Sequence, residues 1–378
     1  MQAIPGVIRY AAPCLFGLEG LVANEMRFLG AENVMAENGR VLFSGGFDMM
    51  ARANIWSRYS ERILILLDEF KAETFEELFE GVKAIPWSQY LNKNDAFPVK
   101  GRSLNSALKS VPDCQRIIKK AVAEKLKDHY KLPWFEESGP VHQIQFLIFK
   151  DKASIMIDTS GDGLHKRGYR AVSNNEAPIK ETLAAAMAEL SRVRSNHVVI
   201  DPMCGSGTIV IEAAMKAMKV APGLNRCFSA EKWTQVPREA WKTEREKAFE
   251  EIKSECGFQG FGYDIDEGVL ATAMENAKKA GVADKIEFKK RDIREFSRQS
   301  GRGTVITNPP YGERMLDVAR AEELYKVMGK KFEDIQGWSY TIISPDENFE
   351  KHFKRKASKR RKLYNGMIKC QVYLYWET

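Results

Sequence analysis

The chain has 378 residues, of which 44% are hydrophobic and 29% charged, and its formal net charge is +7. No apolar run approaches the ~20 residues that cross a bilayer, and the six cysteines and five histidines show neither paired nor zinc-like spacing. We therefore expect no membrane span, no disulfide framework and no bound metal, and a cytoplasmic protein of two or three domains.

The first 160 residues predict two small α+β domains. From about residue 5 to 65, short apolar runs alternate with helical stretches, and ERILILLDEF (61–70) begins a second series of helices and extended segments. We place the first domain at 1–64 and the second at 65–160, and we expect a small sheet in each. Neither is large enough to be the main part of a large enzyme.

The pattern changes after SGDGLHKRGYRAVSNNEAP (160–178), which predicts a linker or an ordered loop. A helix is expected over 179–193, with Pro178 at its start. From 161 to 378 apolar strands then alternate with helices, which is typical of a parallel, doubly wound α/β sheet of Rossmann-like type. Asn365-Gly366 between two strand-like runs predicts a hairpin at the end of this third domain.

The segment VVIDPMCGSGTIVIEAA (198–214) predicts a strand, a glycine-rich turn and a helix. Gly205 and Gly207 permit a turn at positive φ and let a ligand approach the backbone. The helix that begins near Thr208 offers free N–H groups to a carboxylate or phosphate, and Asp201 at the strand tip can bind a cationic or hydroxyl-bearing part of a ligand. Alone, such a turn is more often structural.

Two further strands end on acids, GYDID on Asp264 and KKRDI on Asp292. An acid after the second strand of such a fold binds ribose hydroxyls, and the next one is well placed for an adenine edge. Either could be a helix cap, but capping alone does not explain three strand-end acids behind one glycine-rich turn. The full G-x-G-x-x-G fingerprint is absent, which disfavours a nicotinamide dinucleotide and favours S-adenosylmethionine.

The segment TNPPYGERM (307–315) follows the next apolar strand. Prolines at this point stiffen the chain, so that the Asn308 side chain and the Pro309 carbonyl can both point at one amino group. Two acceptors on an exocyclic amine would direct its lone pair toward a methyl sulfonium, and Tyr311 could stack on a base taken out of its helix. The alternative is a rigid turn with a capping Asn, which the preceding motifs disfavour.

Together these residues resemble the THUMP-domain class of S-adenosylmethionine-dependent RNA methyltransferases, and in particular the bacterial guanine-N2 methyltransferases of 23S ribosomal RNA. The resemblance covers nearly the whole chain, from FPVKGRSLNS through LHKRGYR, APIKETLAAA, DPMCGSGTIVIEAAM, GYDID, RDI and NPPYGERM to KRRKLYNG. It implies a ferredoxin-like domain at 1–64, a THUMP RNA-binding domain at 65–160 and a methyltransferase domain at 161–378. It also implies ribosomal RNA, either 23S or a large-subunit assembly intermediate, as the partner.

The resemblance assigns roles to the residues of these motifs. Glu181 and Thr182 would close over the cofactor, and Asn308, Pro309, Pro310 and Tyr311 would hold the target amine. The expected cofactor-binding residues are Glu181, Thr182, Asp201, Pro202, Cys204, Gly205, Gly207, Thr208, Asp264, Ile265, Asp292, Ile293 and Asn308.

Basic segments predict a path for RNA. KHFKRKASKRRK (351–362) carries eight Lys or Arg residues, and it leads into the predicted hairpin, so we expect an ordered patch beside the catalytic cleft rather than a solvated face. The candidates for RNA binding are Lys100, Arg102, Lys166, Arg167, Arg170, Lys359, Arg360 and Arg361.

The segment 221–251 makes the distance between Asp201 and Asp264 longer than the ~30-residue βαβ unit. The family has such an insert, and we interpret it as an extra loop and helix that forms a wall of the target pocket. Phe228 and Trp233 are candidate contacts there, although buried packing is the commoner role for such residues.

Three other functions are compatible with parts of the pattern. The NPPY segment also suits adenine N6 or cytosine N4 in ribosomal or transfer RNA. It equally suits the N5 amide of a protein glutamine, although such a substrate does not require the N-terminal domains or the basic segments. A non-enzymatic RNA-binding protein that keeps the fold would not need the intact set of Asp201, Gly205, Asp264 and Asn308.

Overall fold

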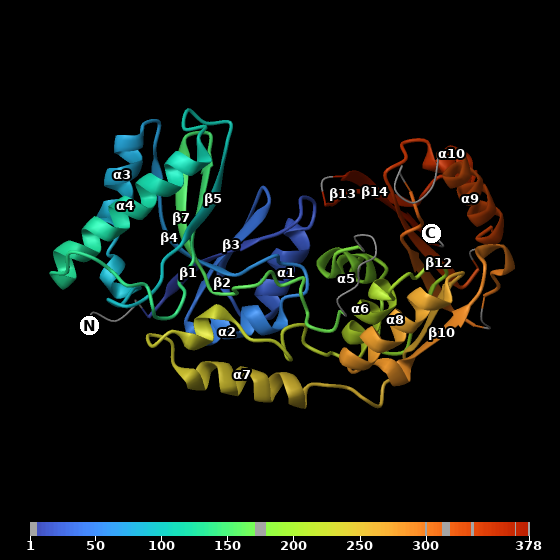
Figure 1. Ribbon diagram of the computed structural model, residues 1–378. Helices are drawn as coiled ribbons and strands as arrows, with labels where there is room; N and C mark the ends of the chain where they lie inside the picture. Colours follow the sequence, from blue (N-terminus) through green and yellow to red (C-terminus); the bar gives the residue numbers. More distant parts are fainter. Residues whose placement is uncertain are drawn as a thin grey trace.

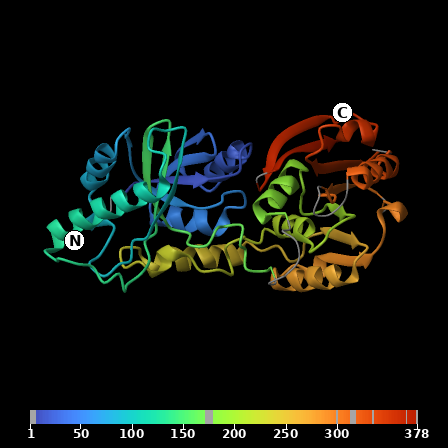
Figure 2. The same cartoon turned by 45° about the horizontal axis from the view of Figure 1, so that its top comes forward.

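The computed structural model describes residues 6–170, 179–298, 301–311, 318–333, 336–366 and 368–376. Within these ranges the chain forms two lobes, each built on a seven-stranded sheet (Figures 1 and 2). None of the helices in these ranges is long and apolar enough to cross a membrane.

The N-terminal lobe contains the first seven strands in the order β2-β3-β1-β4-β7-β6-β5. Its strands are β1 Ile8–Pro13, β2 Glu32–Glu37, β3 Arg40–Gly45, β4 Leu64–Lys71, β5 Val99–Leu104, β6 Ile144–Phe149 and β7 Lys152–Asp158. Its helices are α1 Glu19–Phe28, α2 Phe47–Trp56, α3 Phe75–Ala84 and α4 Val111–Tyr130.

The sheets of the two predicted N-terminal domains are continuous. Strand β1 pairs antiparallel with β4, with Tyr10 opposite Ile65 and Ala11 opposite Leu64. The sequence predicted a separate small sheet in each domain, and in that respect the prediction was wrong. The four residues of this pairing are buried, so the junction is stabilised by apolar burial as well as by ladder hydrogen bonds.

The C-terminal lobe contains the other seven strands in the order β10-β9-β8-β11-β12-β14-β13. Its strands are β8 Val198–Asp201, β9 Gln259–Asp264, β10 Ile286–Lys290, β11 Gly303–Thr307, β12 Trp338–Ser344, β13 Lys359–Asn365 and β14 Ile368–Tyr375. Its helices are α5 Glu181–Leu190, α6 Thr208–Ala217, α8 Glu267–Lys279, α9 Val318–Lys331 and α10 Phe349–Phe353, whereas α7 Arg238–Glu250 lies under the N-terminal lobe (Figure 1).

The doubly wound architecture predicted for this lobe is confirmed. Strands β8 to β12 are parallel, and the chain reverses its direction of winding between β8 and β11, which is where open α/β sheets bind ligands. Each residue of β11 is buried, as expected for a strand covered on both faces. The predicted hairpin is also present: β13 and β14 pair antiparallel, and Gly366 has a φ of 63°.

The segment 221–251 packs against the N-terminal lobe. Helix α7 runs beneath α2 in both views (Figures 1 and 2), and an Arg52 side-chain nitrogen lies 2.8 Å from a Glu244 carboxylate oxygen. The Phe228 ring stacks on Trp241 with centroids 5.2 Å apart, and the Trp233 ring stacks on His142 at 4.2 Å. The buried-packing alternative therefore holds for both aromatic residues, and the interpretation as a target-pocket wall was wrong.

Candidate active site

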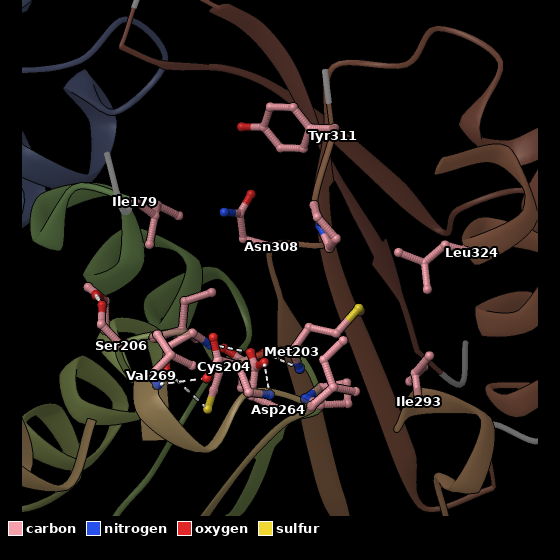
Figure 3. Close-up of a pocket in the computed structure, with 18 of the residues that line it drawn as sticks. Ile179, Met203, Cys204, Ser206, Asp264, Val269, Ile293, Asn308, Tyr311 and Leu324 are labelled. Carbon is pink, nitrogen blue, oxygen red and sulfur yellow. Dashed lines mark hydrogen bonds between the residues drawn. The ribbon is translucent and has the colours of Figure 1, made fainter. Parts of the chain in front are cut away.

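A cavity of about 1080 Å³ lies at the carboxyl ends of the parallel strands (Figure 3). We use the name acid floor for its side formed by Asp201, Asp264 and Asp292, which end or follow β8, β9 and β10. We use the name NPPY wall for the side formed by residues 308–311 after β11. Figure 3 shows Asn308 between Tyr311 on one side and Cys204, Met203 and Asp264 on the other.

The glycine-rich turn is shaped by two left-handed residues, Gly205 with φ 50° and Gly207 with φ 80°. Gly205 lines the cavity, but Gly207 does not. A Cβ at position 207 would approach the Ala273 side chain to 3.1 Å and the Phe288 ring to the same distance. Gly207 therefore lets α8 and β10 pack against the turn, and its role is to set the start of α6 at Thr208 rather than to contact a ligand.

The three acids of the floor are held by backbone N–H groups. Asp264 accepts hydrogen bonds from the N–H of Gly205 at 2.9 Å and of Asp266 at 3.1 Å. Asp292 accepts from the N–H of Arg294 at 2.7 Å and pairs with its guanidinium. Asp292 therefore combines a helix cap with exposure to the cavity, whereas Asp264 lines the cavity while it holds the glycine-rich turn.

Asp201 differs from the other two acids because it is buried. Burial, together with the nearby charge of Asp264, raises the pKa of Asp201 to about 7, although hydrogen bonds including one from the Met203 N–H act in the opposite direction. A positively charged group in the cavity would favour ionisation of this carboxyl.

The NPPY wall presents a buried acceptor. The side-chain oxygen of Asn308 has no hydrogen-bond partner within the described residues, although it is inaccessible to water. Such an orphaned acceptor is uncommon and costs folding free energy, so it is a candidate for a ligand-binding group. Pro310 and Tyr311 line the cavity next to it, whereas Pro309 is buried and does not.

Tyr311 is fixed from the hairpin. The side-chain amide of Asn365 donates a hydrogen bond of 2.7 Å to its hydroxyl, and burial raises its pKa. The hydroxyl therefore stays protonated at neutral pH and cannot serve as a base. Asn365, Gly366 and Ile368 also line the cavity, so the hairpin tip belongs to this site.

The predicted roles of Glu181 and Thr182 do not fit the structure. Both are buried and neither lines the cavity, because the first turn of α5 packs inward. Thr182 donates a hydrogen bond of 2.7 Å to Glu61, and Glu181 forms an ion pair with Arg170 at 2.9 Å. The preceding residues Ile179 and Lys180 line the cavity instead.

Two of the predicted RNA-binding arginines lie elsewhere. Arg167 is buried, donates hydrogen bonds to the carbonyls of Leu164 and Arg58, and pairs with Glu212, so it cannot meet a phosphate on the surface. Arg170 lines the cavity, where its guanidinium donates to the Ile179 carbonyl at 3.1 Å. A run of charged residues does not distinguish a surface patch from a buried ion pair, which explains both errors.

The other predicted RNA-binding residues are exposed. Lys100 and Arg102 lie on β5 at one edge of the N-terminal sheet, and Lys359 and Arg361 lie on β13 at one edge of the C-terminal sheet. Arg360 is exposed but its Nε donates to Glu350 at 2.9 Å, and Lys166 pairs with the exposed Asp162 at the same distance. The structure therefore brings the predicted residues of β5 and β13 to two sheet edges and Lys166 to the loop after β7, and none of them lines the cavity.

Of the expected cofactor-binding residues, ten line the cavity. They are Asp201, Pro202, Cys204, Gly205, Thr208, Asp264, Ile265, Asp292, Ile293 and Asn308. The sequence did not indicate Met203, Lys180, Leu324 or the hairpin tip, because their position depends on contacts between distant segments.

Three family models match the chain. They are described as the RlmL ferredoxin-like domain over residues 9–64, the THUMP domain over 72–158, and the RMKL-like methyltransferase domain over 167–373.

Curated relatives match along nearly the whole of this chain. The chain is 44% identical to "Putative RNA methyltransferase YpsC" of Bacillus subtilis over 95% of this chain and 94% of that protein. It is 33% identical to "Ribosomal RNA large subunit methyltransferase K/L" of Psychromonas ingrahamii over 98% of this chain, but it spans only 50% of that protein's length.

A solved structure shares the fold across both lobes. The crystal structure described as "SMU.472, a putative methyltransferase complexed with SAH" is 40% identical, covers 99% of both chains and superposes with a TM-score of 0.93. The ligand of that protein is S-adenosylhomocysteine, the product that remains when S-adenosylmethionine has given up its methyl group.

Proposed function

The chain belongs to the RMKL-like methyltransferase family, and on that premise we propose that it transfers a methyl group from S-adenosylmethionine to the N2 amine of a guanine in 23S ribosomal RNA. A ribosomal substrate would place the reaction in the cytoplasm. We further propose that its three domains divide at 64/65 and 160/161, near the limits of the three family matches.

The residues of the acid floor fit S-adenosylmethionine. The cavity of about 1080 Å³ is at the upper end of the ~300–1,000 Å³ typical of ligand pockets, so a nucleoside cofactor and a target base can share it. Asp264 would hold the ribose hydroxyls, Asp292 and Ile293 the adenine, and the start of α6 with Arg170 the carboxylate. Asp201 would face the positive charge of the methionine part.

The unpartnered oxygen of Asn308 is the observation that carries the proposal. The bound cofactor supplies an electrophilic methyl sulfonium. Asn308 would accept a hydrogen bond from the target amine, which orients the nitrogen lone pair toward that methyl. Pro309, predicted as a second acceptor, is buried and does not line the cavity, so it would stiffen the segment rather than contact the amine. Because Tyr311 stays protonated, it would stack on the base rather than remove a proton, and the proton would leave to water.

RNA binding is supported by three separate features. The THUMP model matches residues 72–158, and exposed cations lie on β5 and on β13. Strand β13 leads directly into the hairpin tip that lines the cavity. Phosphates bound along β13 would therefore approach the NPPY wall.

Methyl transfer from labelled S-adenosylmethionine to unmodified 23S transcript tests the proposal, with Asn308→Ala in parallel and mass spectrometry of the digested nucleosides. Label in N2-methylguanosine with the wild type alone is the expected result. Label on adenine or cytosine would keep the mechanism and change the base. Label on a protein glutamine and none on RNA, in transcript or in ribosomal particles, would overturn the RNA assignment.

A further inference from the structure

Glu61 connects the two lobes beside the cavity. It precedes β4 in the N-terminal lobe, and its own N–H donates to the Pro13 carbonyl at 2.7 Å. Its carboxylate accepts hydrogen bonds from Lys180 at 2.8 Å and from Thr182 at 2.7 Å, both at the start of α5 in the C-terminal lobe. The ring of His165 lies 3.4 Å from the same carboxylate.

The Glu61 carboxylate is ionised under all ordinary conditions. Burial opposes this, but the nearby His165 ring and the hydrogen bonds from Lys180 and Thr182 lower the pKa of Glu61 to about 2. Only 20% of its side chain is exposed, so water screens these contacts weakly. Hydrogen bonds to an ionised carboxylate are stronger than hydrogen bonds to a neutral acceptor.

The segment that donates hydrogen bonds to Glu61 also contributes residues to the wall of the cavity. Lys180 itself lines the cavity, as does Ile179. The Ile179 carbonyl accepts a hydrogen bond from Arg170, and the same guanidinium donates to the Thr208 hydroxyl at 3.2 Å, where α6 begins. A continuous series of contacts therefore runs from Glu61 in the N-terminal lobe to the helix terminus that is suited to a carboxylate.

We propose that Glu61 is a positioning residue through which the N-terminal lobe holds the start of α5 in its ligand-binding arrangement. The inference rests on the proposed function, because the ligand concerned is S-adenosylmethionine or its product. Without the carboxylate, Lys180 and Thr182 lose their shared acceptor. Residues 179–182 then occupy other arrangements, and the cofactor must bind to the fraction of molecules that is correctly arranged, which raises its Kd.

The test is calorimetric binding of S-adenosylhomocysteine to wild type, Glu61→Gln and a matched control, Glu69→Gln. Glu69 also has a pKa lowered to about 2 and also accepts from three side chains, those of Arg40, Ser154 and Lys152, but all of them lie within the N-terminal sheet. We expect Kd to rise by about tenfold for Glu61→Gln and by less than about twofold for Glu69→Gln. Comparable losses of melting temperature in both variants are expected.

A second variant makes the test independent of folding problems at position 61. Thr182→Val removes one donor from a side chain that does not line the cavity. Its effect on Kd should be severalfold alone and smaller in the Glu61→Gln background, where the amide oxygen is a weaker acceptor than the carboxylate, as expected for two groups that act through one contact. Equal Kd values in wild type, Glu61→Gln and Thr182→Val would overturn the inference, whereas failure of the wild type to bind S-adenosylhomocysteine would overturn the proposed function itself.

Discussion

The acid floor and the NPPY wall differ in how their polar atoms are satisfied before a ligand arrives. Asp264, Asp292 and Asp201 all accept hydrogen bonds from backbone N–H groups, and burial raises the pKa of Asp201 to about 7, so this carboxyl is partly protonated at neutral pH. On the wall, the Asn308 oxygen is buried and has no partner within the described residues. The floor is therefore a preorganised binding surface, whereas the wall holds a buried acceptor that a donor from the substrate would satisfy.

The difference has a consequence for mutations. Removing a floor acid also removes an acceptor of backbone hydrogen bonds, so stability and cofactor affinity should fall together. Removing the Asn308 amide should slow the reaction without such a loss, since the amide oxygen accepts no hydrogen bond within the described residues.

The largest expected effect is that of Asn308→Ala. We expect turnover of RNA to fall roughly 10²–10³-fold, the usual result of deleting one group that stabilises a transition state. The Kd of S-adenosylhomocysteine and the melting temperature should stay close to those of the wild type. Single-turnover kinetics and calorimetry measure the two quantities, and a variant that loses cofactor binding in proportion to turnover would show that the wall belongs to the cofactor site.

The next effect is that of Asp264→Ala on the cofactor. At a concentration 100 times the wild-type Kd, a ligand adds ~2.7 kcal/mol to the free energy of unfolding, and a 100-fold loss of affinity reduces this to ~0.4 kcal/mol. We expect Asp264→Ala to lower the affinity for S-adenosylmethionine about 100-fold, so the cofactor should hardly raise the thermal midpoint of this variant. Equal shifts in both proteins would contradict the assignment of Asp264 to the ribose.

The pH dependence of cofactor binding should reveal the contribution of the Asp201 carboxyl. Its pKa is about 7 in the folded protein and ~3.9 in the unfolded chain, so the folded state binds more protons between these values and the free energy of unfolding falls as the pH rises through this window. A positively charged ligand favours the ionised carboxyl. The affinity for S-adenosylmethionine should therefore rise by about tenfold from pH 5.5 to 7.5, and Asp201→Asn should flatten both dependences.

The acid floor was largely predictable from the sequence because parallel strands end at one edge of a sheet. Asp201 and Asp264 are the last residues of their strands and Asp292 closely follows a third, and local pattern is enough to bring them together. The contribution of Asn365 to the NPPY wall was not predictable, since its hydrogen bond to Tyr311 joins positions 54 residues apart. The β1–β4 pairing and the burial of Arg167 depend on similar long-range contacts, which local patterns do not encode.

The smallest expected effect concerns the route by which RNA reaches the cavity. If RNA approaches from the side of the NPPY wall, the phosphate contacts should be on β13, where Lys359 and Arg361 are exposed. The double variant Lys359→Gln, Arg361→Gln should then lower the salt dependence of RNA binding by ~0.7 per lost contact in the slope of log Kd against log salt. Arg360→Gln should change it less, because Glu350 already pairs with that guanidinium.

Two lysines on α8 provide a matched control for the β13 double variant. Lys278 and Lys279 are exposed near the end of α8, which follows the floor strand β9. Their replacement by Gln removes the same charge from a surface that is not on β13 and should leave the salt slope unchanged. Equal changes in the two double variants would mean that the RNA is attracted by net charge alone, whereas a change confined to β13 would assign the phosphates to the strand that leads into the hairpin tip.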